Sequence, residues 1–126
     1  MCSVRLRLRG HLAKRIRIVN LEHGLPARDE AIRRLDEAIQ QARKAGIPAL
    51  KIIHGWGSSG AGGILRFAVR NHLRKRKDKK EIRVFIPGES WSQFDAYSKE
   101  LLKQLPESLL DADLGRANKG ITLVLL

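Results

Sequence analysis

The sequence has very little cysteine, no long apolar run and few acidic residues. Its single cysteine, Cys2, excludes a disulfide bond within the chain, so we expect a cytoplasmic protein. No apolar run reaches the roughly 18 residues of a membrane-spanning helix, and the basic N-terminus lacks the apolar segment of a signal peptide. One cysteine and four scattered histidines do not supply a cluster of metal ligands, so no metal site is predicted.

The scarcity of acidic residues leaves a large positive charge, which is unevenly distributed. Lysine and arginine number 25 against 13 aspartates and glutamates, for a net charge of +12. Residues 1–80 hold 20 of the basic residues and only 6 of the acidic ones. Such a charge favours a polyanionic partner, so we predict nucleic acid or a ribonucleoprotein such as the ribosome. The alternative is that the charge serves only solubility.

The length and the apolar pattern indicate one α/β domain. A chain of 126 residues with 43% hydrophobic residues suffices for a single core. Residues 1–15 form either a basic N-terminal extension or an edge strand, and residues 16–126 form the domain. The apolar pattern predicts strands at residues 16–21, 50–54, 82–86 and 121–126, and helices at residues 28–45, about 62–76 and after 93.

Two of the predicted helices carry further signals. In the helix at 28–45, acidic residues occupy the first turn and basic residues the last, which suits the helix dipole, and Gly46 is positioned to end it. The last helix is expected to begin with a capping box at residues 90–93. Its expected buried residues are Phe94, Tyr97 (or Ala96), Leu101 and Leu105. Right-handed crossovers between strands would make part of the sheet parallel.

Residues 50–73 are the most informative segment. An apolar run ends at His54, and residues 55–63 then contain five glycines before the next helix. A glycine-rich turn exposes backbone N–H groups at a helix start, where the dipole favours anions, so it predicts a phosphate site. The alternative is that the glycines only make a tight turn.

Two other glycine-loop sites match this segment less well. Gly55, Gly57 and Gly60 formally match GxGxxG, but the chain supplies less sheet than a dinucleotide fold needs, and the next strand lacks its acidic residue. The P-loop pattern fails because no Lys-Ser/Thr pair follows Gly60. Dinucleotide chemistry is therefore the least favoured hypothesis, and the sequence points to no particular cofactor.

Three residues are candidates for catalysis: His54, Glu22 and His23. If the first two strands are parallel neighbours, both end at the edge of the sheet where open α/β folds bind ligands. A carboxylate and an imidazole together can activate a hydroxyl and protonate a leaving oxygen. Alternatively, His54 is hydrogen-bonded to the loop backbone, and Glu22 and His23 are ordinary exposed loop residues.

The nucleic-acid contacts are expected in the glycine loop and on the helix after it. Trp56 would stack on a base, unless it folds back over the helix. Four cations recur along one helix stripe and would follow a phosphate backbone, unless they form only a solvated face. The predicted binding residues are Gly55, Trp56, Gly57, Ser58, Ser59, Gly60, Gly62, Gly63, Arg66, Arg70, Arg74 and Lys77.

The chain resembles the Smr (small MutS-related) domain family. The block KIIHGWG looks like the family's IIHGxG motif and carries His54, Gly55 and Gly57. The resemblance implies a two-layer α/β sandwich with a four-stranded mixed sheet, related to the C-terminal domain of a bacterial translation initiation factor. It also implies nucleic-acid binding and, in several members, endonuclease activity on DNA or RNA.

The first family motif, Asp-Leu-His-Gly, is altered here to Asn20-Leu21-Glu22-His23-Gly24. A gap-free alignment puts Leu21 at the aspartate, and an alignment with one inserted residue puts Asn20 there. Neither alignment retains the aspartate. Two hypotheses follow: an endonuclease that uses His54 with Glu22 or His23, and a non-catalytic module that binds nucleic acid or the ribosome.

Overall fold

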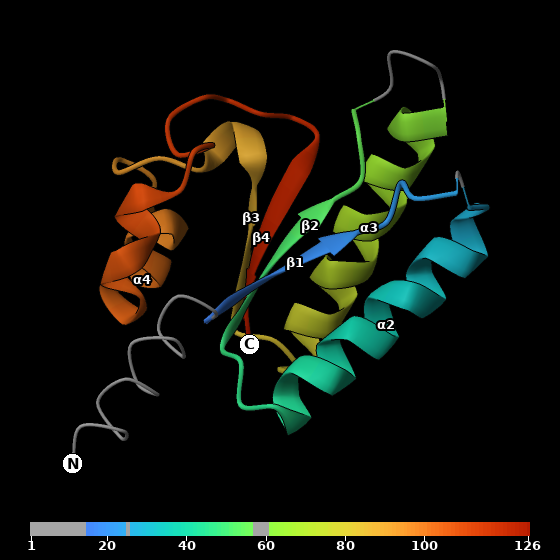
Figure 1. The fold of residues 1–126 in the computed structure, drawn as a ribbon, viewed down its shortest axis with the longest axis horizontal. Helices are drawn as coiled ribbons and strands as arrows, with labels where there is room; N and C mark the ends of the chain where they lie inside the picture. The colour runs from blue at the N-terminus through green and yellow to red at the C-terminus, as the bar shows by residue number, and fades with distance from the viewer. Residues whose placement is uncertain (1–14, 25, 57–60) are drawn as a thin grey trace, which may run out of the picture.

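The structure is a computed structural model that describes residues 15–24, 26–56 and 61–126, with only the backbone of residues 61 and 62. The predicted N-terminal extension, apart from Arg15, and the predicted binding residues Gly57, Ser58, Ser59 and Gly60 lie outside the described residues. Elements are labelled as in Figure 1. They are β1 (Ile16–Asn20), α2 (Arg28–Lys44), β2 (Ala49–Ile53), α3 (Ala61–Asp78), β3 (Val84–Pro87), α4 (Ala96–Gln104) and β4 (Ile121–Leu125), with short 3₁₀ helices η1 (Gly88–Ser90) and η2 (Pro106–Leu110).

The four strands form one mixed sheet in the order β1-β2-β4-β3. β1 and β2 are parallel, with Val19 opposite Ile52, and β4 runs antiparallel to both of its neighbours. The predicted alternation of strands and helices is confirmed, and part of the sheet is parallel as expected. The condition set for the candidate catalytic residues, that the first two strands be parallel neighbours, is met. The last strand therefore lies between β2 and β3, in the interior of the sheet.

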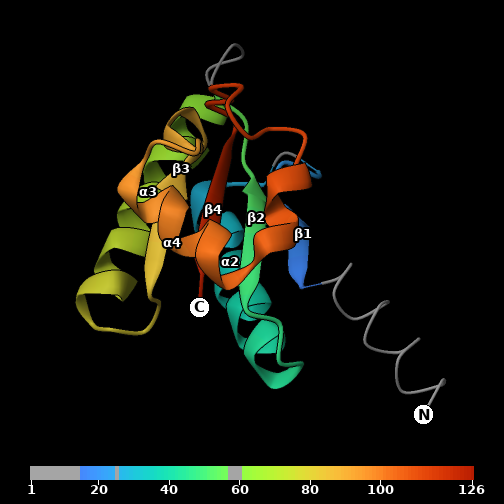
Figure 2. The ribbon, with the colours of Figure 1, turned by 90° about the vertical axis from the view of Figure 1, so that its left-hand side faces the viewer.

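Helices pack on both faces of this sheet. α2 and α3 cover one face, and α4 with η2 lies against the other (Figures 1 and 2). On the first face Leu35, Ile39, Val69 and Leu73 from the helices pack in one cluster with residues of β2 and β4. Each such side chain contributes roughly 1.5–3 kcal/mol when it is fully buried. The α/β class and the four-stranded mixed sheet match the prediction, but helices on both faces make three layers where the family resemblance implied two.

α2 shows why the sequence forms these elements where it does. Its buried residues, Leu35 and Ile39 among them, recur every three or four positions, so one stripe of the helix faces the sheet. At its C-terminal end Gly46 adopts φ +72° and donates its N–H to Arg43 O, while the Ile47 N–H bonds to Ala42 O. This pair of hydrogen bonds is a Schellman motif, and it ends the helix at the position that Gly46 predicted.

The region before α4 differs from the prediction. α4 begins at Ala96, and the Asp95 carboxylate caps it by accepting the Ser98 N–H at 2.9 Å, so the capping box predicted at residues 90–93 is wrong. Phe94 is 91% exposed and Tyr97 is 47% exposed, so the prediction that they are buried is wrong too. Leu101 and Leu105 are buried as predicted.

Trp91 takes the buried aromatic position instead. Residues 88–95 form a 3₁₀ turn and bends rather than the first turn of a helix, which directs the Trp91 ring inward. Its indole N–H donates to Asp111 Oδ2 at 2.9 Å, so its polar atom is satisfied in the core. None of the helices in the described ranges is long and apolar enough to span a membrane.

Candidate nucleic-acid interface

β1 and β2 end side by side at one edge of the sheet, where β4 begins. The Leu21 N–H donates to Ile53 O at 2.8 Å, which continues the parallel pairing past the end of β1. The His54 and Gly55 N–H groups both donate to Gly120 O, at 3.0 and 3.1 Å. The residues that follow both parallel strands are thus brought to one edge, as the sequence predicted.

Gly55 starts the glycine turn in a left-handed conformation, with φ +77°. The Glu22 carboxylate lies directly over it: a Cβ added to Gly55 would be 3.0 Å from Glu22 Cδ and nearer still to Oε2. Only glycine combines this backbone angle with this approach. The carboxylate that follows β1 and the turn that follows β2 therefore form one surface.

His54 is completely buried, and both of its ring nitrogens are hydrogen-bonded. Nδ1 lies 2.6 Å from Gly55 O, which can only accept, so Nδ1 carries the proton and donates it. Nε2 is then the acceptor, and it lies 2.8 Å from Thr122 Oγ1, whose hydroxyl donates to it. Burial, reinforced by the positive charges of Arg70 and Arg66, lowers the pKa of His54 to about 4. The imidazole is neutral at pH 7 and has no ring nitrogen open to a substrate.

Arg70 completes this network and points inward. Its Nε–H donates to Thr122 Oγ1 at 3.1 Å, and its two terminal nitrogens bind the Glu89 carboxylate at 2.9 and 2.7 Å. Partial burial alone would raise the pKa of Glu89, but the bonds from Arg70 hold it below its usual value. The Arg70 side chain is only 13% exposed, so its guanidinium is occupied inside the protein.

The other three cations of the predicted stripe are placed differently. Arg66 lies over the ring of Phe67, with its guanidinium carbon 4.8 Å from the ring centroid. Lys77 Nζ lies 4.1 Å from the centroid of Tyr97. Arg74 is exposed. Within the part of the chain that the structure describes, none of these three cations forms an ion pair with a carboxylate.

Three more of the predicted residues lie open to solvent near the sheet edge, and Gly62 and Gly63 lie in the first turn of α3. Glu22 and His23 are exposed, and Trp56 is 56% exposed. The Glu22 N–H is held by Asn20 Oδ1 at 2.9 Å. Leu21 is only 1% exposed, which favours the alignment that puts Leu21 at the leucine of the first family motif and Asn20 at its aspartate.

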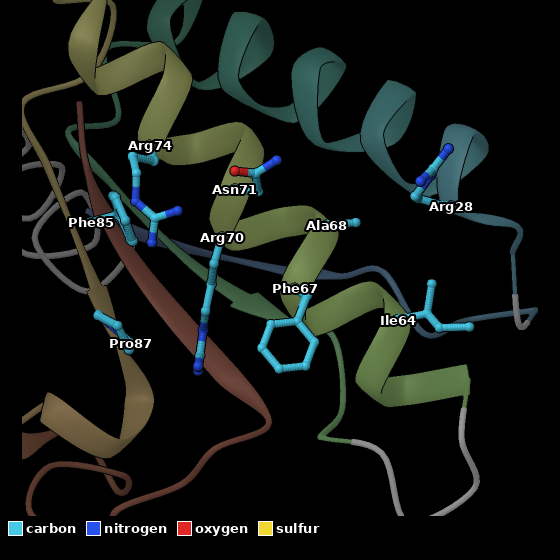
Figure 3. Close-up of a pocket in the computed structure, with 9 residues that line it drawn as sticks. All are labelled: Arg28, Ile64, Phe67, Ala68, Arg70, Asn71, Arg74, Phe85 and Pro87. Atoms are coloured by element: carbon cyan, nitrogen blue, oxygen red, sulfur yellow. The ribbon is translucent and has the colours of Figure 1, made fainter.

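A pocket of about 720 Å³ that the sequence did not predict lies on the side of α3 that faces β3 (Figure 3). Phe67, Arg70 and Arg74 line it from α3, and Phe85 and Pro87 line it from β3. Phe67 is 67% exposed, whereas the apolar residues of α3 that face the sheet, such as Val69 and Leu73, are buried. The sequence does contain a sign of this exposure: Phe67 falls outside the four-residue repeat of the buried residues Leu65, Val69 and Leu73.

The structure defines a small basic α/β domain with polar residues at one edge of its sheet and a helix rich in cations. Among the described residues no group of three or more His, Cys, Asp or Glu is arranged to hold a metal ion. A family model described as the Smr domain matches residues 19–91, from the end of β1 to Trp91. Because this covers more than half of the chain, the protein belongs to the Smr domain family, a nucleic-acid-binding and nuclease-like family.

A solved structure agrees with this assignment. The chain is similar to the crystal structure of the Smr domain of Thermus thermophilus MutS2, with 28% identity and a TM-score of 0.54. The match covers 87% of this chain and 96% of that one. No curated protein matches the chain. The predicted family and its α/β fold with a four-stranded mixed sheet are confirmed.

Proposed function

We propose that this domain binds nucleic acid through the edge where β1 and β2 end and through the outer side of α3. The observation that supports it most is that Arg66, Arg74 and Lys77 extend along α3 from the glycine turn without carboxylate partners among the described residues. Cations that no carboxylate neutralises are available to phosphates, whose neutralisation supplies most of non-specific affinity. The net charge of +12 acts in the same direction.

Paired charge substitutions test this proposal. The double variant Arg74→Ala, Lys77→Ala should bind a labelled 20-mer of any sequence more weakly. The slope of log affinity against log salt should become less steep by up to about 2, one for each lost phosphate contact. The matched control is Lys99→Ala with Lys103→Ala, which removes the same charge from α4 on the other face of the sheet. Equal losses for both pairs would mean that only net charge matters, and would contradict an interface on α3.

The same surface would bind ribosomal RNA, since the contacts are to phosphate. Co-sedimentation with ribosomes at low and high salt tests this form of the proposal. We expect the Arg74 and Lys77 substitutions to release the protein at lower salt than the control pair, because they lower the number of phosphate contacts. A cytoplasmic location, expected from the single cysteine, belongs to the same proposal.

A second candidate function is phosphodiester cleavage, which the exposed pair Glu22 and His23 favours. An attacking hydroxyl oxygen would bond to phosphorus while the bond to the leaving oxygen breaks. One of the two side chains would take the proton of the attacking hydroxyl, and the other would deliver a proton to the leaving oxygen. His54, buried and neutral, would hold the Gly55 turn instead of transferring the proton.

Labelled single- and double-stranded RNA and DNA test cleavage. If the domain cleaves, Glu22→Gln and His23→Ala should remove the products without lowering the melting temperature, because both side chains are exposed. His54→Ala should remove activity only together with stability. If a stable His54 variant loses cleavage while Glu22→Gln remains fully active, His54 and not Glu22 transfers the proton.

A further inference from the structure

We infer that the groove between α3 and β3 holds a nucleic-acid strand with unpaired bases, which stack on Phe67 and Tyr97. This inference rests on the proposed nucleic-acid binding and adds the class of nucleic acid that the domain prefers. It depends on the shape of the groove, on two exposed rings and on the cations beside them.

The groove continues along α3 through two adjoining pockets. The first, of about 720 Å³, extends from Phe67 to β3, and the second, of about 490 Å³, reaches Tyr97 at the start of α4. Both pockets are lined by Arg74, Phe85 and Pro87, so they join at these residues. Figure 3 shows Phe67, Arg70 and Arg74 projecting from successive turns of α3 along the first pocket.

The two rings are placed to receive planar groups. Phe67 is 67% exposed and Tyr97 is 47% exposed, so each leaves apolar surface in water that a stacked base would cover. Each ring also has a cation over one of its faces: Arg66 at Phe67 and Lys77 at Tyr97. Aromatic faces interleaved with cations are typical of surfaces that bind single strands, in which bases stack and phosphates pair with the charges.

The charges in the groove favour nucleic acid over an apolar peptide. At the Phe67 end no carboxylate lines the pocket, and Arg74 lines it without a carboxylate partner among the described residues. Arg28 lines it too and lies 3.6 Å from the exposed Asp29 carboxylate, whereas the charge of Arg70 is already neutralised by Glu89. At the Tyr97 end Asp78 and Asp95 also line the pocket, but Asp95 is engaged in capping α4. The Phe67 end is therefore the stronger part of the surface.

A duplex fits this groove less well than a single strand. In a duplex the bases are stacked on one another, so their faces are closed to a side chain. A strand with unpaired bases breaks no base pair, and loses less stacking than a duplex, for each base that it places on Phe67 or Tyr97. The preference for single strands should therefore depend on the rings, and the general affinity on the cations.

Matched aromatic substitutions test the inference, with one 12-residue oligonucleotide measured as a single strand and as a duplex at the same salt. Phe67→Ala should weaken single-strand binding by about tenfold, the effect of losing one stacked base, and leave duplex binding and the salt slope unchanged. Tyr97→Ala should act in the same direction. Phe94→Ala is the control, because Phe94 is 91% exposed and lines neither pocket, and it should change nothing.

Phe67→Leu separates stacking from the fold, because it keeps an apolar side chain and removes the ring. A similar loss in Phe67→Leu, with an unchanged melting temperature, supports stacking. Equal losses on single strand and duplex, or a wild-type preference for the duplex, would overturn the inference while the proposed function stands. If the wild-type protein binds neither form, the proposed function itself fails.

Discussion

Thr122 and His54 are joined by a 2.8 Å hydrogen bond across 68 residues of sequence. The Thr122 hydroxyl donates to His54 Nε2 and accepts from Arg70 Nε, and the other ring nitrogen of His54 donates to Gly55 O. The chain of bonds thus has one direction, from the guanidinium on α3 to the glycine turn. It places the histidine of the family motif in a supporting position beneath the turn.

Thr122→Val should destabilise the domain, because valine keeps the shape of threonine and removes its hydroxyl. His54 Nε2 and Arg70 Nε would each lose a buried partner, at roughly 1–3 kcal/mol for each group. Urea unfolding measures the loss. Thr122→Ser, which retains the hydroxyl, should lose much less, and equal losses in both variants would show that packing and not hydrogen bonding holds this site.

Stability should fall as the pH drops below about 6.5. The pKa of His54 is about 4 in the folded protein and near 6.5 in the unfolded chain, so below pH 6.5 the unfolded chain binds a proton that the folded protein does not. The loss grows until pH 4 and reaches roughly 3 kcal/mol in total. Urea unfolding at pH 7, 6 and 5 measures it above the range in which most carboxylates titrate. An imidazole of His54 that titrates near 6.5 by NMR would contradict the burial argument.

Gly55→Ala and Gly46→Ala form a matched pair, since both glycines have φ above +70°. Each substitution should cost about 1 kcal/mol of stability for the left-handed backbone. At Gly46 the new methyl group meets nothing within 4 Å, whereas at Gly55 it displaces the Glu22 carboxylate. Only Gly55→Ala should therefore change nucleic-acid binding or cleavage. A similar change in Gly46→Ala would mean that the loss comes from lower stability and that the Gly55 turn has no part in the function.

Lys51→Met should be strongly destabilising. Lys51 is 8% exposed and pairs with both Asp111, at 2.8 Å, and Asp113. Removal of the cation leaves two partly buried carboxylates without their shared partner, at a cost of roughly 3 kcal/mol, measurable by denaturant titration. Arg33→Ala on α2 also removes a cation with two carboxylate partners, but on the exposed surface, and it should cost much less. Equal losses would show that burial does not decide the strength of these pairs.

Local patterns in the sequence predicted most of the fold. The α2 stripe, the C-terminal glycine at Gly46 and the apolar runs of the strands are determined by neighbouring residues, so a reading of the sequence finds them. The region around Trp91 was misread because a capping-box pattern at residues 90–93 competes with the burial of the indole ring beside Asp111. That contact is 20 residues distant in sequence, and no local rule reports it.

The candidate site was predictable in its place but not in the orientation of its side chains. The parallel pairing of β1 and β2 brought Glu22, His23 and His54 to one edge, as the strand order implied. The burial of His54 depends on Thr122, and the inward turn of Arg70 depends on Glu89, both far along the chain. For the same reason the stripe of cations was seen in the sequence, whereas the groove beside Phe67 was not.

The interior place of β4 has a consequence for the synthesis of the protein. β1 and β2 can pair as they emerge from the ribosome, but β3 has no partner until residues 121–125 have also left the exit tunnel. A chain that terminates prematurely before this segment would expose apolar strand edges on both halves, which are prone to aggregation and degradation. The sheet of this domain can therefore be completed only after residues 121–125 have been synthesised.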